Sequence, residues 1–159
     1  MAGIILSIHP NWVQKIISGE KTIEIRKTAP AVATPFRCLI YMTKERYRGD
    51  MAAIALNRNT KHFFDGEQRV VAQFTCYGVE RFDLPYPAYW PEYKASYQYI
   101  LDGSRLSYDD LHRYAGSRPL FAWHIDDLKV FESPKLISDF CRNGNPIKRP
   151  PHSWCYCDL

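Results

Sequence analysis

The chain has 159 residues and a formal net charge of +4, and 46% of its residues are hydrophobic and 24% charged. These values are typical of a globular protein and exclude a chain that is disordered over most of its length. The length suits one domain with a substantial core, which we expect to span residues 1–159. No apolar run approaches the ~20 residues that cross a bilayer, and no signal peptide is recognisable, so we expect a cytoplasmic protein without a membrane segment.

The first expected elements are a strand and a helix. Residues 3–9 are rich in Ile and predict a strand with Ser7 and His9 on one face. Pro10 stands at the first turn of the helix that follows, and Gly19 supplies the left-handed residue that ends it. We assign this helix a packing role, because its apolar residues repeat at helical spacing: Trp12, Val13, Ile16 and Ile17.

Residues 19–27 predict a turn followed by a highly charged strand. Because side chains alternate along a strand, Glu24 and Arg26 share one face, while the isoleucines beside them face the core. Strict alternation would place Lys21 on the opposite face, unless the turn swings it round. Glu24 and Arg26 form either a solvated ion pair or a grip for a polar ligand.

The middle of the chain alternates between apolar strands and less regular insertions. Residues 36–43 are apolar at nearly every position and predict a central strand covered on both faces. Residues 69–82 predict a strand or a bent pair of strands. The insertions are residues 45–68, with a short helical piece near 51–56, and residues 84–118.

The second insertion begins with aromatic residues. Residues 84–99 contain six Tyr or Trp side chains and three prolines, and predict a loop that runs into a helix. Exposed rings can stack on nucleobases, and the alternative is that they fold back as a lid over the core. Ser107 is a candidate helix N-cap followed by acidic residues, and Gly116 ends the short helix that it begins.

The last part of the chain predicts further strands and raises the question of a metal. Residues 120–131 predict a strand pair that contains His124, residues 134–140 predict a short helix, and the tail predicts a strand. The odd number of cysteines, in a chain with no recognisable leader, indicates reduced thiols. We expect neither a metal nor a cofactor, because no cofactor motif is present and the spacing of the one candidate zinc set fits no common motif: Cys141, His152, Cys155 and Cys157.

The basic charge is concentrated at the two ends of the chain. Residues 1–61 contain ten basic and four acidic residues, residues 62–139 contain eight and twelve, and residues 140–159 contain three and one. If the ends lie side by side, their charges merge into one positive face suited to phosphates. A solvated surface is the competing interpretation.

The opening of the chain resembles that of ASCH domains, members of the PUA-like superfamily. Residues 5–10 carry part of this resemblance, and the family hallmark G-x-K-x-x-E-x-R carries the rest, as Gly19, Lys21, Glu24 and Arg26. Residues 35–44, 122–128 and 149–156 are similar to the phage and prophage branch of the family. Residues 45–118 carry no motif of the family.

The resemblance implies an α+β fold, a small PUA-like mixed β-barrel of about six strands with short flanking helices and a cleft beside the first helix. It also implies nucleic-acid binding, with RNA or a nucleotide as the partner. In this cleft Lys21 would donate to a phosphate, Arg26 would contact a phosphate or a base edge, and Glu24 would orient Arg26. We expect further contacts from residues around the motif: Ser7, His9, Lys27, Lys44, His124, Arg149 and Trp154.

An enzymatic function is the main alternative. One branch of the family is an amidohydrolase that removes the acyl group from acetylcytidine with a Lys, a Thr three positions later and a distant Glu. The present chain keeps the Lys as Lys21 but has Glu24 in place of the Thr, so these two would be the catalytic residues on a modified nucleoside or on RNA. A ribonuclease that uses Lys21, Arg26 and His124 belongs to the same alternative. A third hypothesis is a protein partner bound through residues 84–99.

Overall fold

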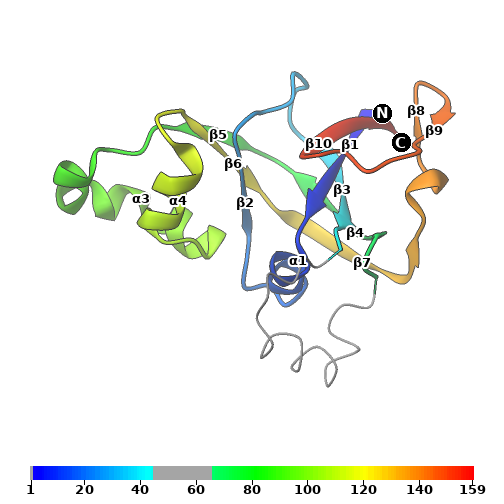
Figure 1. The fold of residues 1–159 in the computed structure, drawn as a ribbon, viewed down its shortest axis with the longest axis horizontal. Helices are drawn as coiled ribbons and strands as arrows, with labels where there is room; N and C mark the ends of the chain where they lie inside the picture. Colours follow the sequence, from blue (N-terminus) through cyan, green and yellow to red (C-terminus); the bar gives the residue numbers. More distant parts are fainter. Residues whose placement is uncertain (1, 45–65) are drawn as a thin grey trace.

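A computed structural model of the chain describes residues 2–44 and 66–159. Within these residues, strands form two main sheets, and helices lie beside and beyond them (Figure 1). The larger sheet has the order β10-β1-β3-β4-β7 and contains β1 (Ala2–Ile8), β3 (Phe36–Met42), β4 (Arg69–Cys76), β7 (Asp126–Lys135) and β10 (Trp154–Asp158). The smaller sheet has the order β2-β6-β5 and contains β2 (Ile23–Arg26), β5 (Val79–Phe82) and β6 (Leu120–His124). A separate hairpin joins β8 (Cys141–Arg142) to β9 (Asn145–Pro146).

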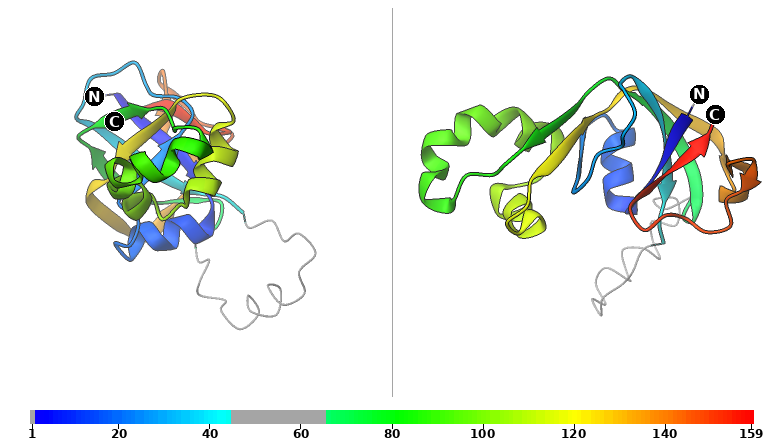
Figure 2. Two further views of the ribbon diagram at one scale, coloured as in Figure 1. Left: turned by 90° about the vertical axis from the view of Figure 1, so that its left-hand side faces the viewer. Right: turned by 90° about the horizontal axis from the view of Figure 1, so that it is seen from above.

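The pairing of the larger sheet brings the two ends of the chain together. β1 pairs in parallel with β3 and in antiparallel with β10, so the first and last strands are neighbours. The two termini lie side by side in all views (Figures 1 and 2). The remaining strand pairs of both sheets are antiparallel.

The helices begin and end where local signals indicate. They are α1 (Pro10–Ile17), α3 (Trp90–Ser104) and α4 (Tyr108–Ala115), with the single 3-10 turns η1 (Pro87–Tyr89) and η2 (Ile137–Asp139). Gly19 has a φ of 80° after α1, as expected. Ser107 and Asp110 form a capping box at the start of α4, and Gly116 follows its end. The predicted boundaries of α1 and α4 are confirmed.

Three apolar clusters hold these elements together. The first lies between the two sheets, where the fully buried Trp123 of β6 meets residues of β1, β3, β4 and α1. The second packs the other face of the smaller sheet, with Ile23 and Ile25, against α3 and α4. The third covers the outer face of the larger sheet with Ile147 and its neighbours. Residues 36–42 are therefore covered on both faces, as predicted for a central strand.

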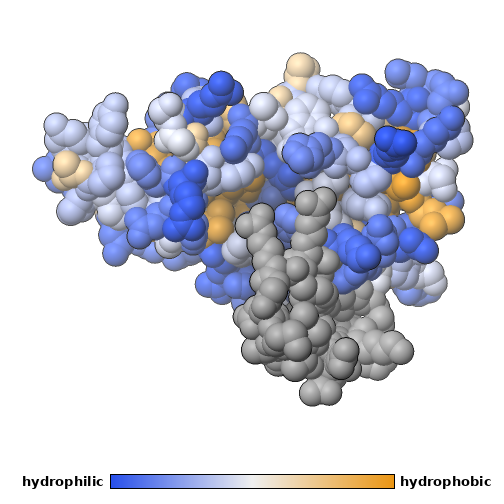
Figure 3. Space-filling model, viewed as in Figure 1, coloured by the Kyte–Doolittle hydropathy of each residue, from blue (hydrophilic) through white to orange (hydrophobic). Residues whose placement is uncertain are grey.

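Residues 84–118 form a helical lobe that projects away from the sheets (Figures 1 and 2). This range is more regular than a loop insertion, because α3 and α4 fill most of it, and it contains both the helix predicted after the aromatic loop and the short helix predicted at Ser107. The lid interpretation is wrong for Tyr86, Tyr89 and Tyr93, which are 77%, 55% and 49% exposed. The lobe surface is accordingly pale in Figure 3, since Tyr and Trp have intermediate hydropathy.

The α+β prediction is confirmed, with three differences of detail. The two main sheets contain eight strands rather than about six, and the segments 69–82 and 120–135 each form two strands, in line with the bent pair and the strand pair predicted there. The helix expected over 134–140 is reduced to η2, because β7 continues to Lys135, which pairs with Val70 of β4. The piece near 51–56 lies outside the described residues, as does most of the first insertion. None of the described helices is long and apolar enough to cross a bilayer.

Candidate functional site

The three charged side chains of the hallmark meet in the interior. Lys21, Glu24 and Arg26 are 3%, 8% and 7% exposed. Nζ of Lys21 lies 3.2 Å from one carboxylate oxygen of Glu24, and a terminal nitrogen of Arg26 lies 2.9 Å from the other. We call these three residues the buried charge cluster. Burial of three charges is unusual, because each requires polar partners to replace water.

Lys21 reaches Glu24 because it precedes the strand. β2 begins at Ile23, so the alternation of strand side chains does not apply to Lys21. The turn at Gly19 brings the backbone N–H of Lys21 to the carbonyl of Lys15 at 2.9 Å. The turn therefore places Lys21 on the same side as Glu24.

The ammonium of Lys21 has three partners. Besides Glu24, it donates to the carbonyl of Ser104 at the end of α3 at 2.9 Å, and it lies 5.0 Å from the centre of the Trp12 ring. Burial lowers the pKa of Lys21, and Glu24 opposes this effect without cancelling it. A lysine with a lowered pKa gives up its proton more readily and can act as a base.

The guanidinium of Arg26 connects three segments of the chain. One terminal nitrogen donates to the carbonyl of Ser7 in β1 at 2.9 Å, and the other donates to the carbonyl and hydroxyl oxygens of Ser153, both at 3.2 Å. Ser7 also donates through its hydroxyl to the carbonyl of Pro151 at 2.6 Å. Arg26 thus fastens β2 to β1 and to the segment before β10. Its Nε is buried without a partner in the described part of the chain.

Two predicted site residues, Lys27 and Trp154, have partners of their own outside the cluster. Lys27 is exposed, and its ammonium lies 4.7 Å from the ring centre of Tyr114 in α4. Burial raises the pKa of Tyr114, and the nearby charges of Arg26 and Glu24 act on it in opposite directions. Trp154 donates from its indole nitrogen to the hydroxyl of Thr28 at 2.9 Å.

The remaining predicted residues fall into two groups. His9, Lys44 and Arg149 are exposed, and Nδ1 of His9 lies 3.1 Å from the hydroxyl of Thr43. His124 is not brought to the cluster. In the sheet, His124 is opposite Ile23, and Trp123 is opposite Glu24. Because successive pairs point to opposite faces, the side chain of His124 lies on the face of the sheet away from Glu24. His124 instead lies 3.8 Å from Glu80, which also accepts from the hydroxyl of Tyr99.

Sequence reasoning missed several residues that complete the cluster. Trp12 was assigned to packing alone, because nothing in a helical apolar stripe indicates a cation above one ring. The carbonyls of Ser104 and Ser153 have no sequence signal, since every residue has a carbonyl. Their contacts with Lys21 and Arg26 span 83 and 127 positions of the chain.

The described residues contain no group of three or more His, Cys, Asp or Glu side chains that could hold a metal ion. All five cysteines are free in the structure. Burial raises the pKa of Cys76 to about 11 and that of Cys157 to about 12. The chemistry available at the cluster is therefore that of a lysine, a carboxylate and an arginine.

Comparison with known proteins supplies the family. A model of the ASCH domain matches residues 6–134. The chain belongs to the ASCH domain family. Its fold matches crystal structures of the ASCH protein of Zymomonas mobilis. For a serine-to-alanine mutant of that protein the identity is 18%, the coverage is 97% of this chain and 87% of that chain, and the TM-score is 0.62.

The structure titled as ASCH from the same organism gives 19% identity, coverage of 97% and 86%, and a TM-score of 0.56. At such low sequence identity, these structural matches show the fold alone. They confirm the PUA-like α+β architecture expected for this ASCH domain. No curated protein matches the chain.

Proposed function

We propose that this ASCH domain is a nucleic-acid-binding module whose ligand is RNA. The RNA strand would lie on the protein surface around the buried charge cluster. ASCH domains have a PUA-like fold that is often linked to RNA binding, which supports the proposal. A cytoplasmic location and membership of the phage and prophage branch stay predictions.

The pairing of β1 with β10 is the observation that carries the proposal. It joins residues 2–44, with six basic and two acidic residues, to residues 140–159, with three and one. The described residues between them, 66–139, have eight basic and eleven acidic residues. The two segments with excess positive charge are therefore neighbours through β1 and β10, and such charge attracts a phosphate backbone.

Within this surface, exposed and buried cations have different tasks. Lys27 and Arg149 are exposed and are the proposed phosphate contacts. Lys21 and Arg26 already donate to main-chain carbonyls and to Glu24, so a phosphate would have to displace those partners. We therefore assign Lys21, Glu24 and Arg26 the positioning of β2 and of the segment before β10, which place Lys27 and Arg149.

The test is an anisotropy titration of a labelled single-stranded RNA and a duplex RNA at two salt concentrations. We expect the double variant Lys27→Glu with Arg149→Glu to bind at least about tenfold more weakly, with a salt slope reduced by about two. The matched control is Lys129→Glu with Lys135→Glu, which reverses two exposed charges on β7. Salt-independent binding, or an equal loss in the control, would contradict the proposal.

The lowered pKa of Lys21 favours a second candidate, hydrolysis of an acylated nucleoside. Neutral Lys21 would take a proton from water as the water oxygen adds to the acyl carbonyl. The C–N bond to the base would then break, and the amino nitrogen would receive that proton. Glu24 lies 3.2 Å from Lys21 and would hold the ammonium formed in this step.

Acetate release from N4-acetylcytidine tests this candidate. Activity of the wild type that is lost in Lys21→Met, with an unchanged circular dichroism spectrum, would support it. No release at any pH between about 6 and 9, a range below the ordinary lysine pKa, would exclude it.

A further inference from the structure

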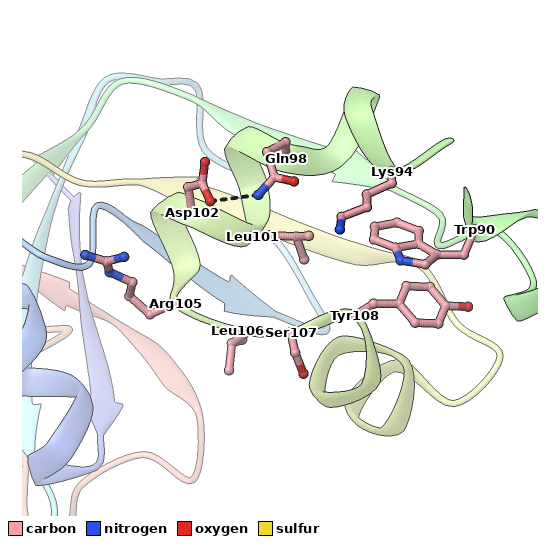
Figure 4. A pocket seen from close by; sticks show the side chains of 9 residues that line it. All are labelled: Trp90, Lys94, Gln98, Leu101, Asp102, Arg105, Leu106, Ser107 and Tyr108. Atoms are coloured by element: carbon pink, nitrogen blue, oxygen red, sulfur yellow. Dashed lines mark hydrogen bonds between the residues drawn. The ribbon is translucent and has the colours of Figure 1, made fainter. Parts of the chain in front are cut away.

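The helical lobe contains a groove that lies apart from the buried charge cluster. It has a volume of about 460 Å³ and runs along α3 to the start of α4 (Figure 4). This volume lies within the range of about 300 to 1,000 Å³ that is typical of small-molecule sites. We call it the lobe groove.

One end of the lobe groove is an aromatic wall. Trp90 and Tyr108 stack on one another with ring centres 4.3 Å apart. The hydroxyl of Tyr108 donates to the carbonyl of Pro85 at 2.6 Å, which fixes this ring in place. Leu101 and Leu106 continue the apolar lining. Because the two rings face one another, a flat ring of a ligand would contact their edges, and this preformed wall needs no reordering of side chains.

Two cations line the same groove. Lys94 lies one helical turn after Trp90, and its ammonium points toward the Trp90 ring (Figure 4). Lys94 has no hydrogen bond or ion pair within residues 2–44 and 66–159. Arg105 uses only Nε, which donates to the carbonyl of Glu20 at 2.9 Å, and its terminal nitrogens have no partner among the same residues. Both cations therefore retain donors for an anion.

The groove also contains one carboxylate, Asp102. Its Oδ1 accepts from the side-chain amide of Gln98 at 2.8 Å, and neither cation forms an ion pair with it among the residues that the structure describes. The lining therefore has one excess positive charge, in a lobe whose other exposed residues include many acids. Lys94 lies beside the aromatic wall, and Arg105 lies at the opposite end of the groove (Figure 4).

We propose that the lobe groove binds a nucleoside monophosphate group, with the base against Trp90 and Tyr108 and the phosphate on Lys94. The same group occurs in a free nucleotide and in a nucleic-acid strand. The site shares no side chain with the buried charge cluster, so it extends beyond the proposed function and does not depend on it.

An NMR titration of the full chain, labelled with ¹⁵N, tests the proposal. The probes are AMP, adenosine, inorganic phosphate, a short single-stranded RNA and an acidic peptide. The indole N–H signal of Trp90, assigned with Trp90→Phe, reports the aromatic wall, the amide signal of Lys94 reports the cation beside it, and the amide signal of Arg105 reports the opposite end of the groove. We expect AMP to shift the signals of Trp90 and Lys94 more strongly than adenosine or phosphate does.

The variant Lys94→Glu decides whether the charge matters. We expect its dissociation constant for AMP to rise about tenfold, while the control Lys129→Glu leaves it unchanged. If the RNA alone shifts these signals and Lys94→Glu weakens that effect, the group comes from a strand. The proposal is overturned if neither AMP nor RNA shifts them, if phosphate alone binds as tightly as AMP, or if only the acidic peptide binds.

The two proposals fail separately. AMP shifts that persist in Lys27→Glu with Arg149→Glu support the lobe groove even if RNA binding around the cluster is absent. Loss of AMP binding in that variant would place the nucleotide at the cluster instead and overturn the assignment to the lobe groove.

Discussion

The buried charge cluster and the lobe groove each contain a lysine and an arginine, but the two regions use their cations differently. Lys21 and Arg26 are almost fully buried, and main-chain carbonyls and Glu24 hold them. Lys94 and Arg105 are exposed, with free donors in the described part of the chain. A buried cation must be paired inside the protein to offset the loss of its hydration. An exposed cation stays hydrated without a partner and can bind a ligand. The cluster therefore connects segments of the fold through its internal partners, and the groove remains available for binding.

Removal of the shared anion should produce the largest effect. Glu24→Gln leaves Lys21 and Arg26 buried without a counter-charge, and we expect the free energy of unfolding to fall by about 3–5 kcal/mol. The control Asp83→Asn breaks an exposed ion pair with Arg81, 3.0 Å long, and should cost less than about 1 kcal/mol. Urea unfolding measures both, and equal losses would show that the cluster is not held together by its charges.

A change at the junction of the two regions comes next. A Cβ at Gly103 in α3 would lie 2.7 Å from Cδ1 of Ile23 in β2. We expect Gly103→Ala to cost a net 1–2 kcal/mol, roughly, because overpacking outweighs the better helix propensity of alanine. Ile23→Val removes that Cδ1 and should recover part of the loss when the two are combined. Strictly additive effects in a double-mutant cycle would contradict this contact.

The titration of Lys21 should give a smaller, pH-dependent effect. Its pKa in the folded protein lies below the ordinary 10.5, so between these two values the unfolded chain binds more protons than the folded chain. The free energy of unfolding should then rise with pH in this window, by at most about 1.4 kcal/mol per pH unit. Below the pKa that Lys21 has in the folded protein, Lys21 is charged in both states, and burial of its charge lowers the free energy of unfolding by the full amount.

The measurement compares urea unfolding of the wild type and Lys21→Met at several pH values up to about 9.5, below the ordinary lysine pKa. Cys76 and Cys157 have raised pKa values, so their titration lowers stability above about pH 9 in both proteins and cancels in the difference. A difference between the two proteins that does not change with pH would contradict the lowered pKa.

The smallest effect is expected in the lobe groove. Lys94→Glu should change the free energy of unfolding by less than about 0.5 kcal/mol, because no partner is lost among the described residues. Lys21→Glu, the same substitution in the cluster, should prevent folding, since it buries two carboxylates beside each other. Thermal unfolding followed by circular dichroism distinguishes these outcomes. A strongly destabilised Lys94→Glu would show that Lys94 has a structural role.

Elements with local signals were predictable from the sequence. Pro10 and Gly19 mark the ends of α1, and Ser107 with Gly116 mark those of α4, because caps and left-handed residues act over a few positions. The hallmark spacing likewise identified Lys21, Glu24 and Arg26 as a group.

Contacts between distant segments were not predictable. The sequence left open on which side Lys21 lies, and it gave no sign of the carbonyls that hold Lys21 and Arg26. The sequence also left open whether the tyrosines of the lobe form a lid or are exposed, and the structure places Tyr86, Tyr89 and Tyr93 in solvent.

The sequence by itself therefore determined the ends of its helices, the apolar faces of its strands and the set of charges at the hallmark, since each depends on neighbouring residues. Only the tertiary structure decided that those charges are buried, that the basic ends of the chain pair as β1 and β10, and that Lys94 and Arg105 line a groove. The physical reason is that burial and pairing depend on segments that fold together across the whole chain, and the carbonyl groups that satisfy buried cations are the same in every residue.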